Sequence, residues 1–150
     1  MKRKVLAQII DHTQLKPEAT PAQIRELCAE TQDHGFGAVC INPSYVPLAV
    51  KFLQGSDVEV CTVIGFPLGA TTTSAKVCEA EIALAQGATE LDMVLPIGHL
   101  KTGDHAVVEN DIRAVAALCH AHDALLKVII EAFLLTDDEK IAACTLAQRA

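Results

Sequence analysis

The sequence predicts an α/β protein made of parallel strand-then-helix units, about five of which are present. Apolar runs of strand length alternate with segments of helix length, and strand starts recur every few tens of residues, the length of one such unit. The composition, 51% hydrophobic but only 3% aromatic, suits aliphatic helices packed on buried strands. Right-handed crossovers make consecutive strands neighbours in one sheet. Two architectures remain open, a parallel barrel and an open doubly wound sheet.

The first unit has the clearest helix and the weakest strand. A short apolar run around residues 9–11 is the expected strand. Thr20 followed by Pro21 predicts an N-cap with proline at the first helical position, and Gly35 predicts the end of that helix. The apolar positions between them have helical spacing, so a helix is expected over this range.

The second and third units repeat the order of strand, loop, helix and glycine. Strands are expected over residues 37–42 and 58–64. A short helix over about 44–54 follows the first of them, and Gly55 ends it. The helix of the third unit is expected to run up to Gly87, with these apolar positions facing the sheet: Val77, Ala80 and Leu84.

The fourth and fifth units complete the series. Strands are expected over residues 89–95 and 125–131, and a loop with Pro96, Gly98 and Gly103 follows the first of them. The helix between the two strands carries Val108, Ile112, Val115 and Cys119. Thr136 and Glu139 have the spacing of a capping box, which predicts a helix running to the last residue. Because no linker interrupts the chain, residues 1–150 are expected to form a single domain.

Composition argues against several classes of partner. The formal net charge of −7, with no run of Lys or Arg after residue 4, predicts neither nucleic-acid nor membrane binding. The apolar stretch that begins at Val5 is short and is interrupted by Gln8, so a signal peptide is not expected. The six cysteines are scattered without a C-x-x-C pair, which predicts small apolar core residues in a reducing cytoplasm and no metal site.

Charged residues inside apolar strands are the best candidates for function. In a parallel sheet buried on both faces, a charge is costly unless it is paired or used in chemistry. Strand alternation places Asp92 on the same face as Glu90, and Lys127 on the corresponding face of the next strand. If these faces line a barrel interior, Asp92 and Lys127 can meet and tune each other for proton transfer. A buried structural ion pair is the alternative.

Three other features have simpler explanations. Cys40 lies inside a strand without a base tied to it by sequence, which favours a packing role over a nucleophile. The segment 65–69 precedes a helix N-terminus but lacks the glycine patterns of phosphate-binding loops, so a tight turn with an N-cap is expected. His120 and His122 are too close to share a helical face, and both are expected to be solvated.

Five segments together resemble the deoxyribose-phosphate aldolase family. They are Ile-Asp-His-Thr-Gln-Leu-Lys-Pro from residue 10, Ala-Val-Cys-Ile-Asn-Pro from residue 38, Thr-Val-Ile-Gly-Phe-Pro-Leu-Gly-Ala from residue 62, Glu-Leu-Asp-Met-Val from residue 90 and Leu-Lys-Val-Ile-Ile-Glu from residue 126. The segments occur in family order over essentially the whole chain. Five matches at family-like spacing are far more specific than any one of them.

The resemblance implies a fold, a reaction and a set of site residues. Such enzymes are class I aldolases on a (β/α)8, or TIM, barrel, and they interconvert 2-deoxyribose 5-phosphate with acetaldehyde and glyceraldehyde 3-phosphate through a lysine Schiff base, with no metal and no cofactor. Asp92 matches the aspartate of the family's proton relay, and Lys127 matches the lysine beside it. Asp11, Thr13 and Cys40 match positions that line the small-aldehyde end of the pocket.

The resemblance also implies a departure. The family's Schiff-base lysine lies on the sixth strand, and its second lysine and phosphate loops lie on later strands, all beyond Ala150. The 150 residues, read as units 1–5 of an incomplete barrel, are therefore expected to be inactive alone. Their uncovered edges predict a homo-oligomer, an exchange of units between chains, or relaxation to an open five-stranded, flavodoxin-like sheet. A self-assembling fragment without chemistry and a small-molecule binding module remain as alternative functions.

Overall fold

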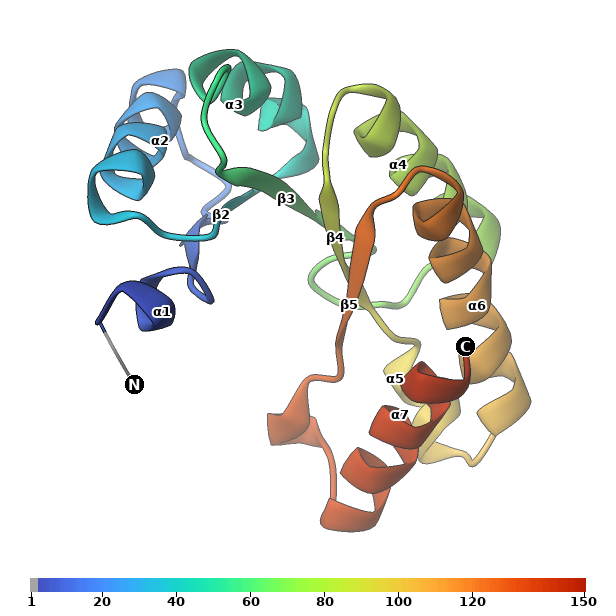
Figure 1. The fold of residues 1–150 in the computed structure, drawn as a ribbon. Helices are drawn as coiled ribbons and strands as arrows, with labels where there is room; N and C mark the ends of the chain where they lie inside the picture. The colour runs from blue at the N-terminus through green and yellow to red at the C-terminus, as the bar shows by residue number, and fades with distance from the viewer. Residues whose placement is uncertain (1–2) are drawn as a thin grey trace.

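The computed structural model describes residues 3–150 and contains one parallel sheet of five strands (Figure 1). The strand order is sequential, and each strand pairs in parallel with the next one along the chain. A flavodoxin-like sheet has the order 2-1-3-4-5 instead, so the flavodoxin-like alternative is wrong, and the prediction of parallel strand-then-helix units in barrel order is confirmed. The strands are β1 (Asp11–Gln14), β2 (Ala38–Ile41), β3 (Glu59–Ile64), β4 (Glu90–Val94) and β5 (Leu125–Ile129).

The sheet is curved as in a barrel. In a flat sheet, four intervals of about 4.8 Å would separate β1 from β5 by about 19 Å. Yet Nζ of Lys127 on β5 lies 3.1 Å from Oδ2 of Asp11 on β1. Two side chains cannot bridge 19 Å, so the face that carries them is concave. Within residues 3–150 the sheet does not close, because β1 and β5 each pair with one strand only.

Most of the helices lie along the convex side of the sheet (Figure 1). The helices that pack on strands of the sheet are α2, α3, α4 and α6, whereas α5 and α7 pack on α6 and on each other. The described helices are α1 (Arg3–Ala7), α2 (Pro21–His34), α3 (Val46–Phe52), α4 (Thr73–Ala85), α5 (Ile97–Lys101), α6 (His105–Ala121) and α7 (Asp137–Arg149), with short 3-10 turns η1 (Pro43–Tyr45) and η2 (Ala132–Leu134).

Alternation along the strands divides the core into two parts. The larger part lies between the sheet and the helices and includes Val39, Leu91 and Met93, all fully buried. The smaller part lies on the concave face, where Ala38, Cys40, Cys61 and Val63 form a separate apolar cluster. The concave face is therefore apolar along β2 and β3 and charged toward β4 and β5.

Several local predictions are confirmed. Thr20 caps α2 through a capping box with Gln23, and Gly35 ends that helix at φ +66°. The capping box of Thr136 and Glu139 begins α7. The turn over 65–69 leads to α4, whose N-cap Thr72 accepts a hydrogen bond from the amide of Ala75. His120 and His122 are both exposed, as expected.

Other local predictions need correction. The first strand begins at Asp11, and residues 9 and 10 precede it with exposed side chains. Helix α1 occupies part of the opening stretch, where none was expected, and α5 occupies the expected loop around Gly98. The packing interpretation of the cysteines is wrong for Cys78 and Cys144, which are exposed, while the other four are buried.

A buried ion pair that was not expected from the sequence connects two helices to the sheet. Lys76 of α4 is fully buried, and its Nζ lies 2.6 Å from Oδ2 of Asp111 on α6. The same ammonium donates a hydrogen bond to the carbonyl of Val94 at 2.9 Å, and Thr73 donates to the other oxygen of Asp111. This network anchors the carboxyl end of β4. Over residues 3–150, no helix has both the length and the apolarity to cross a membrane.

Candidate functional site

The candidate site centres on the Lys127 ammonium, which meets three carboxylates on the concave face. Its Nζ lies 3.1 Å from both Asp11 Oδ2 and Asp92 Oδ1, and it donates a hydrogen bond to Glu90. The three carboxylates come from β1 and β4. Strand register explains the meeting, because Asp92 pairs directly with Lys127, and Glu90 lies two residues earlier on the same face.

The electrostatics of the cluster keep Lys127 charged. Burial alone would lower the pKa of Lys127, but the hydrogen bond to Glu90, the neighbouring Cys61 and the carboxylates of Asp11 and Asp92 outweigh it. The pKa of Lys127 is therefore raised above its ordinary value of 10.5. One ammonium faces three carboxylates, so the cluster carries an excess of negative charge.

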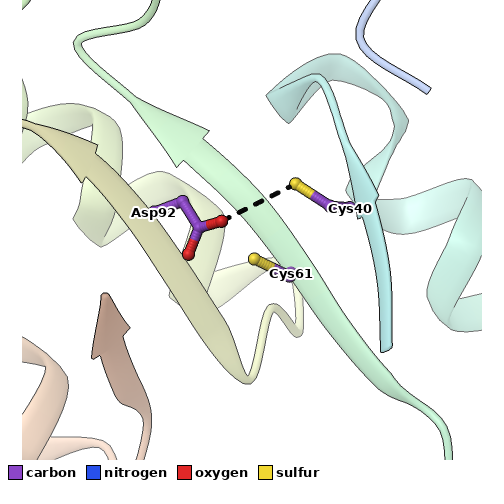
Figure 2. A group of neighbouring side chains, drawn as sticks. All are labelled: Cys40, Cys61 and Asp92. Carbon is purple, nitrogen blue, oxygen red and sulfur yellow. Dashed lines mark hydrogen bonds between the residues drawn. The ribbon is translucent and has the colours of Figure 1, made fainter. Parts of the chain in front are cut away.

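Two thiols lie beside the same aspartate (Figure 2). Cys40 of β2 and Cys61 of β3 are direct partners in the sheet register and are both buried. The Cys40 thiol donates a hydrogen bond to Oδ2 of Asp92, and the distance between the sulfur and that oxygen is 3.9 Å. The hydrogen bond with Cys40, together with burial, raises the pKa of the Cys61 thiol, so that thiol is protonated at neutral pH.

The two oxygens of Asp92 have different environments. Oδ2 accepts from Cys40, whereas Oδ1 lies 3.1 Å from Lys127 Nζ without hydrogen-bonding alignment. Oδ1 is itself shielded from solvent, although 15% of the Asp92 side chain is exposed on the concave face. The aspartate therefore links the charged part of the face to the thiol pair.

The structure places the five residues singled out from the sequence on one face. Asp11, Asp92 and Lys127 are in direct contact, and Cys40 adjoins Asp92. Thr13 lies opposite Cys40 in the register, but it is exposed and its hydroxyl donates to the backbone oxygen of Asp11 at 2.8 Å. The packing role expected for Cys40 agrees with its burial in the concave apolar cluster. The catalytic and binding roles of these residues stay predictions.

Two members of the cluster were not singled out as site residues. The alternation of β4 already places Glu90 on the face of Asp92, and that pattern is a sufficient signal for it. Cys61 left no such signal, because its meeting with Cys40 depends on the register between β2 and β3. Sequence spacing predicts no metal site, but spacing along the chain cannot detect donors that come from separate strands. The structure brings together two such groups of three donors. One group is Cys40, Cys61 and Asp92, and the other is Asp11, Cys61 and Glu90.

A second hollow lies away from this cluster. The loops that follow β3 and β4 enclose a cavity of about 620 Å³, lined by residues 68–72 and by Ile97, His99 and Asp104 among others. His99 and Asp104 contact each other at 3.2 Å. No member of the Lys127 cluster lines this cavity, so we assign the candidate site to the concave face of the sheet.

Known proteins are similar to this chain in sequence and in fold. Deoxyribose-phosphate aldolase of Clostridium kluyveri is 54% identical over all 150 residues, which span 68% of that protein. The enzyme of the same name from Streptococcus pneumoniae serotype 19F is 54% identical over 145 residues, 65% of its length. The chain thus spans about two thirds of the curated relatives it matches.

Solved structures agree with this result. A structure described as a deoxyribose-phosphate aldolase from Coccidioides immitis superposes with a TM-score of 0.93 at 50% identity, over 98% of this chain and 57% of the other. A tetrameric deoxyribose phosphate aldolase from Aeropyrum pernix gives a TM-score of 0.90 at 32% identity, over 99% and 62% of the two chains. The family model described as DeoC/LacD family aldolase matches residues 5–147. The chain therefore belongs to the DeoC/LacD aldolase family.

Proposed function

We propose that this chain supplies the proton-transfer part of a class I aldolase that cleaves 2-deoxyribose 5-phosphate to acetaldehyde and glyceraldehyde 3-phosphate. Its membership of the aldolase family and the name of its relatives support the reaction class. The single observation that carries the residue roles is the 3.1 Å contact between Asp92 Oδ1 and Lys127 Nζ inside a concave, partly buried face. Such a pair can hold and move a proton beside a reacting carbon.

In this proposal the covalent step requires a neutral lysine amine from another part of the enzyme. The amine attacks the substrate carbonyl and water leaves. As the C–C bond breaks, a base takes the proton of the hydroxyl on the departing carbon, which becomes the aldehyde of glyceraldehyde 3-phosphate, and the protonated imine accepts the electron pair of the bond. A proton must then reach the carbon of the resulting enamine, and Asp92, oriented by Lys127, is placed to direct it. Asp11, Thr13 and Cys40 would line the small-aldehyde end.

Lys127 itself is unsuited to the covalent step. It is the only lysine on the five strands, but its three carboxylate neighbours favour the ammonium, which has no lone pair for attack. The remaining described lysines lie on loops or helices, and Lys76 is fully buried against Asp111. We therefore propose that the 150 residues alone do not catalyse the cleavage.

Borohydride trapping tests this assignment. The chain is incubated with 2-deoxyribose 5-phosphate and borohydride, alone and together with a second chain that carries the sixth to eighth strands of a family member. We expect cleavage and a reduced adduct only in the mixture, with the adduct on a lysine of the second chain. An adduct on Lys127, or sustained cleavage by the 150 residues alone, would overturn the proposal.

A variant pair tests the role of Asp92 in the same mixture. Asp92→Asn keeps the shape of the side chain but removes its ability to carry the proton, so we expect kcat to fall by about 10²–10⁴. Asp57→Asn is the matched control, because Asp57 is exposed in the loop before β3 and belongs to no part of the site. Equal kcat values for the two variants would contradict the role given to Asp92.

A second candidate function, self-assembly, is favoured by the open edges of the sheet. Leu125 of β5 is 53% exposed and Phe133 just after it is 94% exposed, and β5 and β1 each lack a second partner within residues 3–150. Uncovered strand edges pair readily with other chains. Size-exclusion chromatography with light scattering is expected to give a mass above that of one chain, and a monomeric peak at all concentrations would exclude this candidate.

A further inference from the structure

We propose that Cys40, Cys61 and Asp92 form a binding site for a thiophilic divalent cation, with Zn²⁺ as the ion that their donor atoms suit best. The three residues come from three neighbouring strands, and one ligand atom of each lies within 4.8 Å of the other two (Figure 2). Two sulfurs and one carboxylate oxygen form a donor set that Zn²⁺ accepts.

The geometry needs only a small adjustment to hold an ion. Around a tetrahedral Zn²⁺ with Zn–S bonds of about 2.3 Å, neighbouring donor atoms are about 3.5–3.8 Å apart. Donors that already lie within 4.8 Å therefore need to approach by at most about 1.3 Å, which rotation of the side chains can supply. A fourth position remains for water or for a carboxylate of the neighbouring cluster.

The surrounding charges determine which oxygen and which donor group the ion uses. The groups that face the site are Asp11 on β1, Glu90 beside Asp92 on β4, and Lys127 on β5. Lys127 forms ion pairs with Asp11 and Glu90, and its ammonium also lies beside Oδ1 of Asp92. The other oxygen of Asp92, Oδ2, is therefore free to face the sulfurs. This distribution favours the two thiols and Asp92 over the alternative group of Asp11, Cys61 and Glu90.

The Lys127 ammonium does not exclude a cation from the site. Its Nζ lies 3.5 Å from Cys61 Sγ. The Cys61 thiol is protonated in the absence of an ion, so an ion that binds there displaces the thiol proton. Three carboxylates against one ammonium leave a negative excess that attracts a divalent ion. The 15% exposure of Asp92 on the concave face gives the ion a path to otherwise buried sulfurs.

A titration with Co²⁺, a coloured substitute for Zn²⁺, tests the site in the 150-residue chain. The reduced protein is titrated in oxygen-free buffer while thiolate-to-metal charge-transfer and tetrahedral d–d absorption are recorded. We expect one Co²⁺ per chain in a thiolate-containing tetrahedral site, and Zn²⁺ should displace it because Zn²⁺ binds such donors more tightly. The absence of this spectrum would overturn the proposal. The result does not depend on whether the chain takes part in aldol cleavage.

Variants identify the donors. Cys61→Ala is expected to weaken Co²⁺ binding by at least about 100-fold and to remove most of the charge-transfer absorption, and Asp92→Asn by at least about 10-fold. Cys119→Ala is the matched control, because Cys119 is equally buried but lies alone in α6. Co²⁺ binding that survives Cys61→Ala but disappears in a Cys78→Ser, Cys144→Ser double variant would show that the exposed thiols bind the ion, and it would overturn the proposal.

Proton release gives a measurement that needs no variant. Binding of one ion through two thiols displaces two protons, which a pH indicator detects in weakly buffered solution. We expect about two protons per Zn²⁺ near neutral pH, and a value near zero would exclude coordination by the two sulfurs. This measurement decides the question even if Cys61→Ala fails to fold, which far-UV circular dichroism would reveal.

Discussion

The buried Lys76–Asp111 pair allows a sharp test of what holds the sheet to its helices. In Lys76→Met a side chain of similar length remains, but Asp111 keeps a buried charge without its 2.6 Å partner. The side-chain exposures of the pair are 0% and 3%, so solvent can screen very little of that charge. The carbonyl of Val94 also loses its hydrogen bond from the ammonium.

We expect Lys76→Met to lower the free energy of unfolding by about 3–5 kcal/mol, the usual cost of removing one partner of a buried pair. A domain has a net stability of only about 5–15 kcal/mol, so a change of this size moves the urea midpoint clearly. The measurement is urea unfolding followed by far-UV circular dichroism, at several protein concentrations so that association is separated from folding.

Three further variants, Asp111→Leu, the double variant and Lys140→Met, turn this experiment into a double-mutant cycle with a control. Replacing both partners, as in Lys76→Met with Asp111→Leu, removes the orphaned charge, so the double variant should recover about 2–3 kcal/mol relative to the sum of the single effects. Lys140→Met removes the exposed pair with Asp137 on α7, and it should cost less than about 1 kcal/mol. If Lys76→Met costs no more than Lys140→Met, the reasoning about burial is refuted.

Three further predictions concern the backbone, a thiol and pH. Gly69→Ala should destabilise the chain by at least about 2 kcal/mol more than Gly103→Ala. Both glycines have positive φ, but only a Cβ at Gly69 would lie 2.1 Å from a backbone oxygen in the loop after β4. Equal urea midpoints for the two variants would contradict this prediction. Burial raises the pKa of Cys28 from 9.0 to about 11, which lowers the thiolate fraction of Cys28 about 100-fold near pH 8. Iodoacetamide should therefore label the exposed Cys78 well before Cys28 in the native protein, and peptide mass spectrometry measures the two rates. The pKa of Lys127 is raised in the folded state, so the contribution of Lys127 to stability is complete below its ordinary pKa of 10.5 and is lost as pH rises through the higher folded pKa. The difference in unfolding free energy between wild type and Lys127→Met should therefore stay constant from about pH 7 to 9. A decline within that window would be inconsistent with a raised pKa.

Local signals in the sequence predicted most of the elements because capping and periodicity act over a few residues. The capping boxes at Thr20 and Thr136 fix two helix starts, and Gly35 fixes one helix end. The first strand was placed too early because apolar Ile9 and Ile10 precede it, while β1 itself reads Asp-His-Thr-Gln. A strand that lines a polar concave face carries no apolar run, so the usual signal is missing there.

The candidate site was partly accessible by the same logic. Alternation within β4 and β5 was enough to place Asp92 and Lys127 on one face, and the register confirms that they are direct partners. The same alternation could have added Glu90. Alternation does not show how the residues of two neighbouring strands are paired. For that reason the sequence predicts only a core position for Cys61, and its pairing with Cys40 becomes visible in the register.

The sequence by itself determined the order of the strands and helices, the helix caps and the division of each strand into two faces, since these depend on neighbours in the chain. Tertiary structure alone decided the contacts of Asp11 with Lys127, of Cys40 with Cys61 and of Lys76 with Asp111. The physical reason is that these contacts depend on strand register, sheet curvature and helix packing. These three quantities are set by the close packing of the whole chain, and no short stretch of residues encodes them.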